Sequence, residues 1–227
     1  MSARTIVTAA AMWTISTAFP ATHLGAQECV GLPTHRASFS FGLEGTDGAS
    51  GGSAGVMIRA GSVHLGLTHA SLDKFAQVDH IASTGLEVAW RWTGGAEVCG
   101  VAAADWTRYE DGPGVQSTAV EYVSTGDYTR IRTPLGISVG HELWEGHRVG
   151  ITPFLTLAMV YDYERMRLAA GGVDTRGSFG PGTSFGFTTR FGRVLLRSQV
   201  ANAWTEDRAL SNHPNHWKLL VHLGWAF

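Results

Sequence analysis

The stretch WKLLVHLGWAF, residues 217–227, decides the fold. Its odd-numbered residues are all apolar, and they share one face of an extended strand because successive strand side chains point to opposite sides. The other face carries Lys218, His222 and two small residues, with Leu220 as its one large apolar member. Residues at a chain end usually fray. A regular amphipathic strand in this position therefore predicts a fold in which the last strand is paired on both sides.

The composition favours β-structure with many turns. The sequence has 227 residues and 29 glycines, and 16% of its residues are charged, whereas an ordinary soluble domain has about 25%. The formal net charge is −2, so the basic surface that nucleic-acid binding requires is missing and no nucleic-acid partner is expected. After residue 19, no apolar run approaches the ~20 residues of a membrane helix.

The first 26 residues have the layout of a secretory signal peptide. Arg4 precedes an apolar stretch over 6–19, and small residues end the segment at Ala26. The alternative is an N-terminal membrane anchor, for which the apolar stretch is short. No Leu-Ala-Gly sequence precedes Cys29, so lipidation is not expected. The sequence predicts an exported protein with a signal peptide over 1–26 and one domain over 27–227.

Period-two alternation of apolar residues, interrupted by turn residues, predicts an all-β, up-and-down antiparallel fold. The expected strands cover residues 35–44, 53–60, 63–69, 85–92, 96–109, 129–143, 148–164, 183–191, 194–204 and 217–227. This count is ten, and eight strands remain possible if two weak segments are loops.

The connections predict a transmembrane barrel. Short turns are expected near residues 61, 94, 145 and 192, and long loops over 45–53, 70–80, 110–127, 165–181 and 204–216. Such barrels have short periplasmic turns and longer extracellular loops. The tryptophans beyond residue 26 all lie near one strand end or the other, as aromatic girdles at two membrane interfaces would require.

The C-terminal stretch resembles the assembly signal of bacterial outer-membrane proteins, with alternating apolar residues and a terminal Phe. The signal would comprise Trp217, Leu219, Val221, Leu223, Trp225 and Phe227. The whole chain after residue 26 resembles the family of small outer-membrane β-barrels of OmpA/OmpX type. The resemblance implies a multi-pass protein of the bacterial outer membrane with periplasmic termini. It also implies contact with outer-membrane lipids and lipopolysaccharide, and with the barrel-assembly machinery during insertion.

Two histidine motifs are candidate sites, although the sequence predicts no catalytic residue, cofactor or metal. His69 and Ser71 resemble the His-x-Ser spacing of outer-membrane lipid A deacylases, and residues two apart on a strand share a face. Leu72 stands where that family has Asn, so chance pairing is the preferred interpretation. His213 and His216 have metal-ligand spacing but no adjacent Cys or acidic partner.

Acidic residues near the expected outer rim give a second enzymatic hypothesis, because omptin proteases use acidic residues and an Asp-His pair there. The candidates are Asp105, Asp111, Asp127, Asp162, Glu164 and His213. No omptin motif accompanies them, and acidic loop residues are usually only solvated.

Cys29 and Cys99 are the two cysteines of the chain. Export permits a disulfide, and both residues are expected near the periplasmic end. The sequence therefore predicts a bond that ties the N-terminal segment to the barrel.

If the apolar faces meet lipid, the opposite faces place a set of charged residues in the lumen. The set is Arg59, Glu87, Arg91, Arg130, Arg132, Glu142, Arg190, Arg197, Lys218 and His222. We expect a mostly filled polar core with Glu87 and Glu142 as the anionic partners, which Glu97 or Asp105 could join. Separate solvated charges in a water-filled lumen are the alternative.

The function predicted from the sequence is structural, surface-interacting or envelope-maintaining, without catalysis. An outer-membrane enzyme acting on lipid or peptide at the extracellular rim is one alternative. A narrow, porin-like diffusion pore is the other, because ten strands lie between filled and channel-forming sizes.

Overall fold

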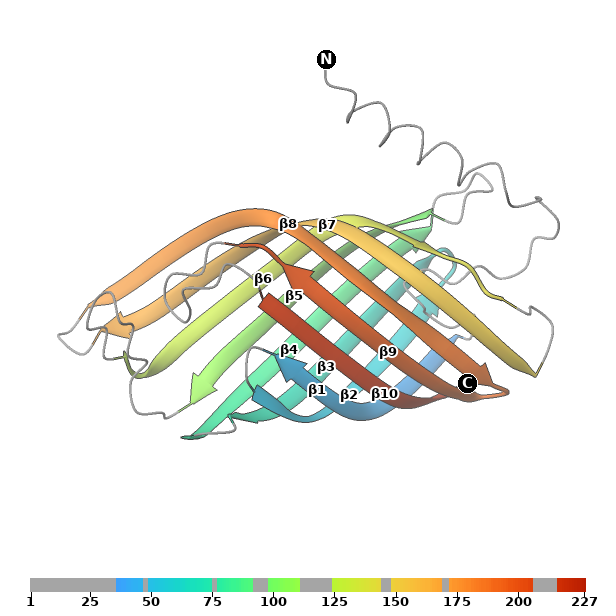
Figure 1. Ribbon diagram of the computed structural model, residues 1–227, viewed down its shortest axis with the longest axis horizontal. Coiled ribbons are helices and arrows are strands. Elements are labelled where there is room, and N and C mark those ends of the chain that lie inside the picture. Colours follow the sequence, from blue (N-terminus) through green and yellow to red (C-terminus); the bar gives the residue numbers. More distant parts are fainter. Residues whose placement is uncertain are drawn as a thin grey trace, which may run out of the picture.

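The computed structural model describes residues 36–46, 49–74, 77–91, 98–110, 124–143, 148–168, 172–205 and 216–227. These residues form one closed antiparallel β-barrel of ten strands (Figure 1). The predicted all-β, up-and-down architecture is confirmed, with ten strands rather than eight. No helix in the described part of the chain is long and apolar enough to cross a membrane.

Each strand pairs with its neighbours in the chain, and the first strand closes on the last. The strands are β1 (Ala37–Thr46), β2 (Ala49–Ala60), β3 (Val63–Lys74), β4 (Gln77–Arg91), β5 (Val98–Glu110), β6 (Ser124–Gly140), β7 (Val149–Leu168), β8 (Val173–Phe191), β9 (Val194–Ala203) and β10 (His216–Ala226). The β1–β10 ladder runs from Ser38 opposite Ala226 to Thr46 opposite Lys218. The last strand is thus paired on both sides, as its amphipathic pattern predicted.

The two ends of the barrel differ in how the strands are connected. At one end, here called the turn end, Gly61 and Gly192 form tight turns with φ of 62°, a conformation that glycine adopts without strain. The other end, here called the loop end, contains the connection between β5 and β6 over 111–123 and the one between β9 and β10 over 204–215.

The expected alternation of short turns and long loops was wrong at three places. The β1–β2, β3–β4 and β7–β8 connections cover only 47–48, 75–76 and 169–172, because the strands continue into the expected loops. The glycine-rich segment before residue 183 is strand β8, not a loop. Gly177 faces the Tyr161 ring, whose hydroxyl would lie 2.7 Å from an added Cβ. Glycine at this position permits close packing and does not mark a turn.

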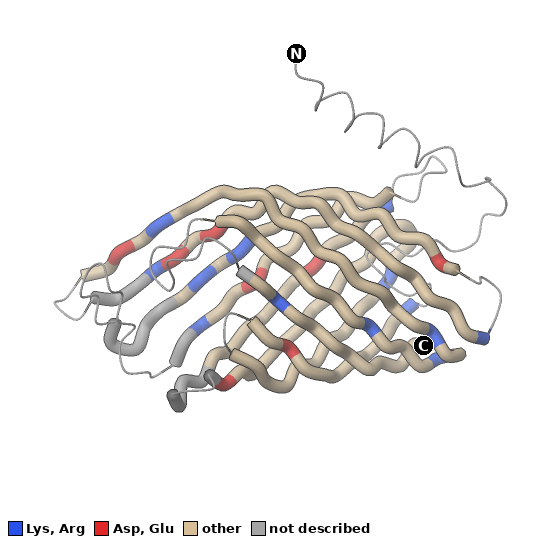
Figure 2. Tube along the Cα trace, viewed as in Figure 1, with Lys and Arg blue, Asp and Glu red and all other residues tan. Residues whose placement is uncertain are grey.

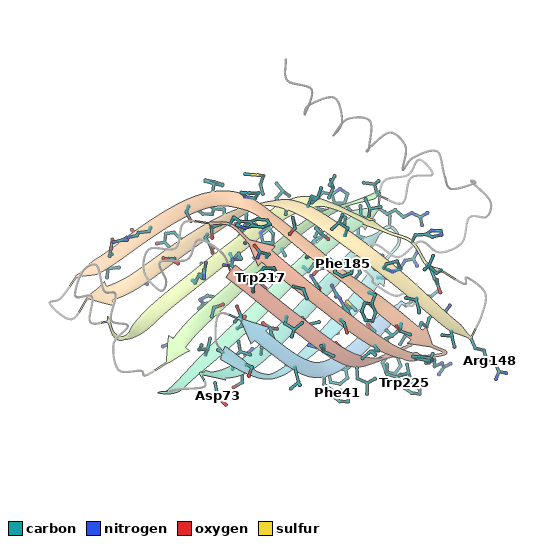
Figure 3. All side chains as sticks on the ribbon, in the orientation of Figure 1. Phe41, Asp73, Arg148, Phe185, Trp217 and Trp225 are labelled. Carbon is teal, nitrogen blue, oxygen red and sulfur yellow. The ribbon has the colours of Figure 1, made fainter. Side chains whose placement is uncertain are left out.

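The register turns apolar side chains outward on every strand. Exposed large apolar residues, one from each strand in order, are Phe39, Val56, Leu65, Leu86, Trp106, Leu135, Leu155, Phe185, Val200 and Leu219. Figure 3 shows Phe41 and Trp225 projecting away from the barrel wall. Most large apolar side chains therefore form the outer surface of the barrel, whereas the inside holds mainly small or polar residues together with a few buried apolar ones such as Phe154 and Leu220.

Exposed aromatic residues lie near both ends of this outer surface, and Phe41, Phe185 and Phe187 lie between them. Phe191, Trp225 and Phe227 lie at the turn end. Trp106, Phe179, Trp204 and Trp217 lie towards the loop end. Trp92 and Trp144, which the sequence assigned to the turn-end girdle, lie outside the described residues.

Strands β6, β7 and β8 extend well beyond their neighbours at the loop end (Figure 1). They have 17, 20 and 19 residues, whereas a tilted strand crosses a bilayer with about 9–11. Their loop-end parts form a projecting sheet, here called the β6–β8 extension.

Candidate functional site

The lumen is the candidate functional site, because the register directs charged side chains into it. The inward faces of the strands carry Arg59, Glu87, Arg91, Arg130, Arg132, Arg190, Arg197, Lys218 and His222, and buried Glu142 follows β6. These are the ten residues that the sequence assigned to the lumen. In Figure 2 the charged positions on β6, β7 and β8 gather towards the loop end.

Asp162 is the centre of an ion-pair network at the loop end. Arg130 donates to both of its carboxylate oxygens, with Nε to Oδ1 at 2.9 Å and Nη2 to Oδ2 at 2.6 Å. Arg132 approaches Oδ2 with Nε and Nη2, each at 3.2 Å, and Thr205 Oγ1 donates to the same oxygen at 2.7 Å. Asp162 is 1% exposed, and its negative charge is compensated by two guanidinium groups.

Lys218 extends this ion-pair network to the opposite side of the lumen. Its Nζ lies 3.0 Å from Glu44 Oε1 on β1 and 3.6 Å from Asp105 Oδ1 on β5. Asp105 is directly opposite Arg132 in the β5–β6 ladder. Side chains of β1, β5, β6, β7 and β10 thus form one belt of alternating charge. We call this belt the loop-end network.

Arg197 occupies the middle of the lumen. Its Nη2 donates to Gln199 Oε1 at 2.9 Å and lies 4.0 Å from Glu87 Oε2. The guanidinium carbon stands 5.5 Å from the centre of the Phe154 ring, which is a cation–π distance. Its Nη1 lies 3.9 Å from the Met57 sulfur. Arg197 therefore links polar and apolar side chains from four different strands.

Two further groups of polar contacts lie in the described lumen. His222 lies between two serine hydroxyls, with Ser40 Oγ 3.0 Å from Nδ1 and Ser53 Oγ 2.6 Å from Nε2. Nearer the turn end, Arg190 Nη2 donates to Glu142 Oε1 at 2.6 Å. Both histidine nitrogens are thus occupied by hydrogen bonds, and the Glu142 carboxylate has a cationic partner.

The centre of the lumen contains a cavity of about 170 Å³. Lys218, Arg132 and Asp105 of the loop-end network border it, and Arg197 and Glu87 border it as well. Long polar side chains therefore occupy part of the described lumen and leave this cavity between them. Glycine and alanine line much of the remaining wall.

Sequence reasoning chose two of the lumen anions and overlooked two that are more deeply buried, Asp162 and Glu44. Glu142 binds Arg190, and Glu87 reaches Arg197 only at 4.0 Å. Glu44 is missing from the predicted lumen set, and Asp162 was a candidate for the outer rim. The missed signal was parity, since both have even numbers within strands whose even-numbered residues face inward.

His69 and Ser71 lie on the outward face of β3, where both are exposed. They share a face as their spacing predicted, but His69 Nδ1 is 3.0 Å from Thr84 Oγ1 on the neighbouring strand. This histidine thus makes a cross-strand hydrogen bond to Thr84. A catalytic role for His69 and Ser71 remains an untested hypothesis.

Two other candidate sites depend on residues outside the described part of the chain. His213 lies outside the described residues, and only the backbone of His216 is described. Among the described residues, no group of three metal-ligating side chains occurs. Cys99 is buried on the inward face of β5, while Cys29 lies outside the described residues together with 1–26. The signal peptide and the Cys29–Cys99 bond remain predictions.

Comparison with known proteins identifies no family. No protein-family model matches the sequence, and no curated protein matches it. The resemblance to OmpA/OmpX-type barrels therefore remains a prediction.

Similar solved structures are β-barrel proteins of low sequence identity. Ail, the attachment invasion locus protein of Yersinia pestis, was crystallised with the heparin analogue sucrose octasulfate. It is 10% identical, with 84% of this chain and 97% of that chain covered and a TM-score of 0.44. Neisserial surface protein A is 15% identical, with 84% of this chain and 97% of that chain covered and a TM-score of 0.43. The translocator domain of the autotransporter NalP from Neisseria meningitidis is 12% identical, with 99% of this chain and 96% of that chain covered and a TM-score of 0.38. None of these similarities assigns a function to this chain.

Proposed function

We propose that this chain is an integral protein of the bacterial outer membrane with a lumen closed by ion pairs. In this proposal the β6–β8 extension projects from the cell surface and binds a partner there. The protein performs no catalytic step, and its role is structural or surface-interacting.

The single observation that carries the membrane assignment is the apolar outer surface. Each strand exposes large apolar side chains, and aromatic residues border this surface towards both ends. A water-soluble barrel would have the reverse arrangement, because burying apolar side chains inside is the main driving force of its folding. Lipid contact also explains why the central charges face inward, since a charge at the bilayer midplane costs about 2–4 kcal/mol on a barrel's lipid face.

The loop-end network supports a closed lumen. Its side chains come from β1, β5, β6, β7 and β10, so they meet across the barrel and not only along one wall. Asp162 and Glu44 are each no more than 3% exposed. A wide aqueous channel would leave such carboxylates hydrated.

The β6–β8 extension supports a surface-interaction role, since its length exceeds what a bilayer crossing needs. The described part of the extension bears exposed Arg165, together with Asp174 and Arg176, whose side chains form a partly exposed ion pair at 2.9 Å. Charged side chains on a rigid sheet outside the bilayer can contact a polar partner without changing the barrel.

Fractionation of the cells that produce the full chain tests the location. We expect the protein in the outer-membrane fraction, and we expect its gel mobility to change on heating because a closed barrel resists detergent at room temperature. Recovery in a soluble fraction without detergent would overturn the proposal.

Surface labelling tests the orientation. A Thr175→Cys variant places a thiol on the β6–β8 extension, and Ser62→Cys places one in a turn at the other end. A membrane-impermeant maleimide should label the first variant in intact cells and the second only after permeabilisation, with the unmodified chain as background. The reverse pattern would show that the extension faces the periplasm.

A further inference from the structure

The ion pair between Glu87 and Arg197 spans the lumen and is loose. Glu87 lies on β4 and Arg197 on β9, which stand on opposite sides of the closed barrel. Glu87 Oε2 and Arg197 Nη2 are 4.0 Å apart, whereas a hydrogen bond between such groups has a length of about 2.7–3.2 Å. The two side chains therefore attract each other without a direct hydrogen bond.

Each side chain of this pair also has a buried atom without a partner. Glu87 Oε1, which is an acceptor, and Arg197 Nε, which carries a donor hydrogen, make no hydrogen bond to the described residues. A buried polar atom without a partner is destabilising, especially when it belongs to a charged group. A molecule that donates to Glu87 and accepts from Arg197 would satisfy both atoms at once.

Both side chains border the central cavity, and the other charged groups at its border already have counter-charges. Lys218 pairs with Glu44 and Asp105, and Arg132 pairs with Asp162. An ionic ligand would have to compete with these partners for its own counter-charge. A neutral ligand needs none, so the arrangement favours a neutral molecule that carries both a donor and an acceptor.

The remaining lining and the volume set the shape of a suitable occupant. Gln199, two residues from Arg197 on the same face of β9, offers amide N–H donors to the cavity, and Ser184 offers a hydroxyl. Ala103 and Ala201 add small apolar surfaces. The cavity measures about 170 Å³, and a cavity of about 150 Å³ accommodates benzene. A ligand of at most this size therefore fits, with its polar atoms towards Glu87 and Arg197.

We propose that this cavity is a binding site for a small, neutral molecule with a carboxamide or urea group. The carbonyl oxygen of the ligand accepts from Arg197 Nε and from the Gln199 amide, and its N–H donates to Glu87 Oε1. Its carbon atoms lie against Ala103 and Ala201. Such a ligand reproduces the hydrogen bonds of the waters that it replaces, so its entry does not leave the polar groups unpaired. This inference concerns the lumen alone and stands whether or not the barrel has the proposed cellular location.

Acetamide and acetone form a matched pair of probes. They have nearly the same size and the same carbonyl acceptor, but acetone has no N–H to donate to Glu87. Titration of the folded full chain in detergent micelles is followed by 15N–1H NMR of the Arg197 Nε–H and the Gln199 side-chain amide. We expect a saturable shift with acetamide and at least tenfold weaker binding of acetone, because acetone leaves the Glu87 carboxylate oxygen unsatisfied.

Variants test whether the probe binds in the cavity. Ala103 faces Glu87 across the β4–β5 ladder, and its neighbour Ala104 lies opposite outward-facing Leu86. Ala103→Phe should weaken acetamide binding at least tenfold because its ring occupies the cavity, whereas Ala104→Phe should stay within about twofold of the unmodified chain. Glu87→Met removes the acceptor and should reduce the preference for acetamide over acetone to less than about twofold. Heat-dependent gel mobility establishes that each variant retains a closed barrel.

The comparison of the two probes on the unmodified protein does not depend on any variant. Crystals soaked in acetamide should show the probe between Glu87 and Arg197. Equal binding of acetamide and acetone, or equal acetamide binding by the Ala103 and Ala104 variants, would overturn the proposal. Water alone in the soaked crystals, together with no saturable shift in solution, would show that the cavity is only hydrated and would overturn it as well.

Discussion

Arg130 binds Asp162, although Glu164 is its direct neighbour across the β6–β7 ladder. The guanidinium donates twice to the diagonal Asp162, and Glu164 Oε1 lies 3.8 Å from Arg130 Nε. The long arginine side chain reaches the diagonal position, which remains within contact range on a sheet. Arg132, which is directly opposite Asp162, binds the same carboxylate. One buried acid thus holds two arginines of the neighbouring strand in fixed positions.

Replacement of this shared acid is expected to destabilise the barrel. Asp162→Asn leaves Arg130 and Arg132 without their common anion in a buried site. Removal of one partner from a buried ion pair costs about 3–5 kcal/mol. Urea-induced unfolding in lipid vesicles, followed by tryptophan fluorescence, measures the change in the free energy of unfolding.

Asp174→Asn is the matched control for this prediction. Asp174 also binds one arginine, Arg176, but the two side chains are 30% and 38% exposed. Exposed ion pairs contribute only about 0–1 kcal/mol, so the control should change little. Equal effects of the two substitutions would show that the loop-end network does not stabilise the barrel.

The alternation of large apolar residues along each strand is sufficient to predict the barrel. In β10 and in β1, alternate residues are large and apolar, and these are the residues that lie exposed on the outer surface. Such a pattern does not depend on distant contacts, because a strand has a side-chain period of two. The same parity correctly assigns Arg130, Lys218 and His222 to the lumen.

The strand ends and the ion-pair partners could not be predicted in the same way. The sequence around Gly177 predicts a loop, whereas the missing side chain of this glycine accommodates the Tyr161 ring of a neighbouring strand. Arg130 and Asp162 are 32 positions apart in the chain, so their contact depends on the relative register of two strands. Both features are set by tertiary packing, which a single strand's pattern does not contain.

A charge on the outer surface provides a test of lipid contact. Ile137 is exposed on the outer face of β6, within the range of residues that the aromatic girdles border. If it faces lipid, Ile137→Arg should lower the free energy of unfolding in vesicles by about 2–4 kcal/mol. Denaturant titration of the inserted barrel measures this difference.

Thr175→Arg is the control for Ile137→Arg. Thr175 is also exposed and outward-facing, but it lies near the tip of β8 in the β6–β8 extension. Its substitution should change the unfolding free energy by less than about 0.5 kcal/mol, as is usual for a solvated surface site. A similarly small effect of Ile137→Arg would contradict lipid contact at the centre of the outer surface.

The two cysteines should form a disulfide that ties the N-terminal segment to β5. Cys99 is buried near the turn end, facing the lumen. Peptide mass spectrometry without reductant should find Cys29 joined to Cys99. Loss of such a bond typically costs about 2–4 kcal/mol, so Cys99→Ser should lower stability and make Cys29 reactive towards alkylating reagents. Two free thiols in protein purified without reductant would contradict the pairing.

The loop-end network should also prevent ion flow through the lumen. The unmodified protein in planar bilayers should show little steady conductance, because Lys218 and Asp105 meet across the barrel and Arg132 binds Asp162 beside them. The double variant Arg132→Ser/Lys218→Ser leaves Glu44, Asp105 and Asp162 without two of their cations. Repulsion between these carboxylates and the space left by two long side chains should admit water and produce a cation-preferring conductance.

Arg148→Ser/Arg193→Ser removes the same number of positive charges at the turn end and is the matched control. Both of its targets are exposed and lie at the opposite end of the barrel from the loop-end network, so this variant should show as little conductance as the unmodified chain. The comparison separates closure by the lumen side chains from a general effect of net charge. A large, stable, anion-preferring conductance of the unmodified protein would mean that the lumen is an open pore and that its ion pairs line a water-filled path.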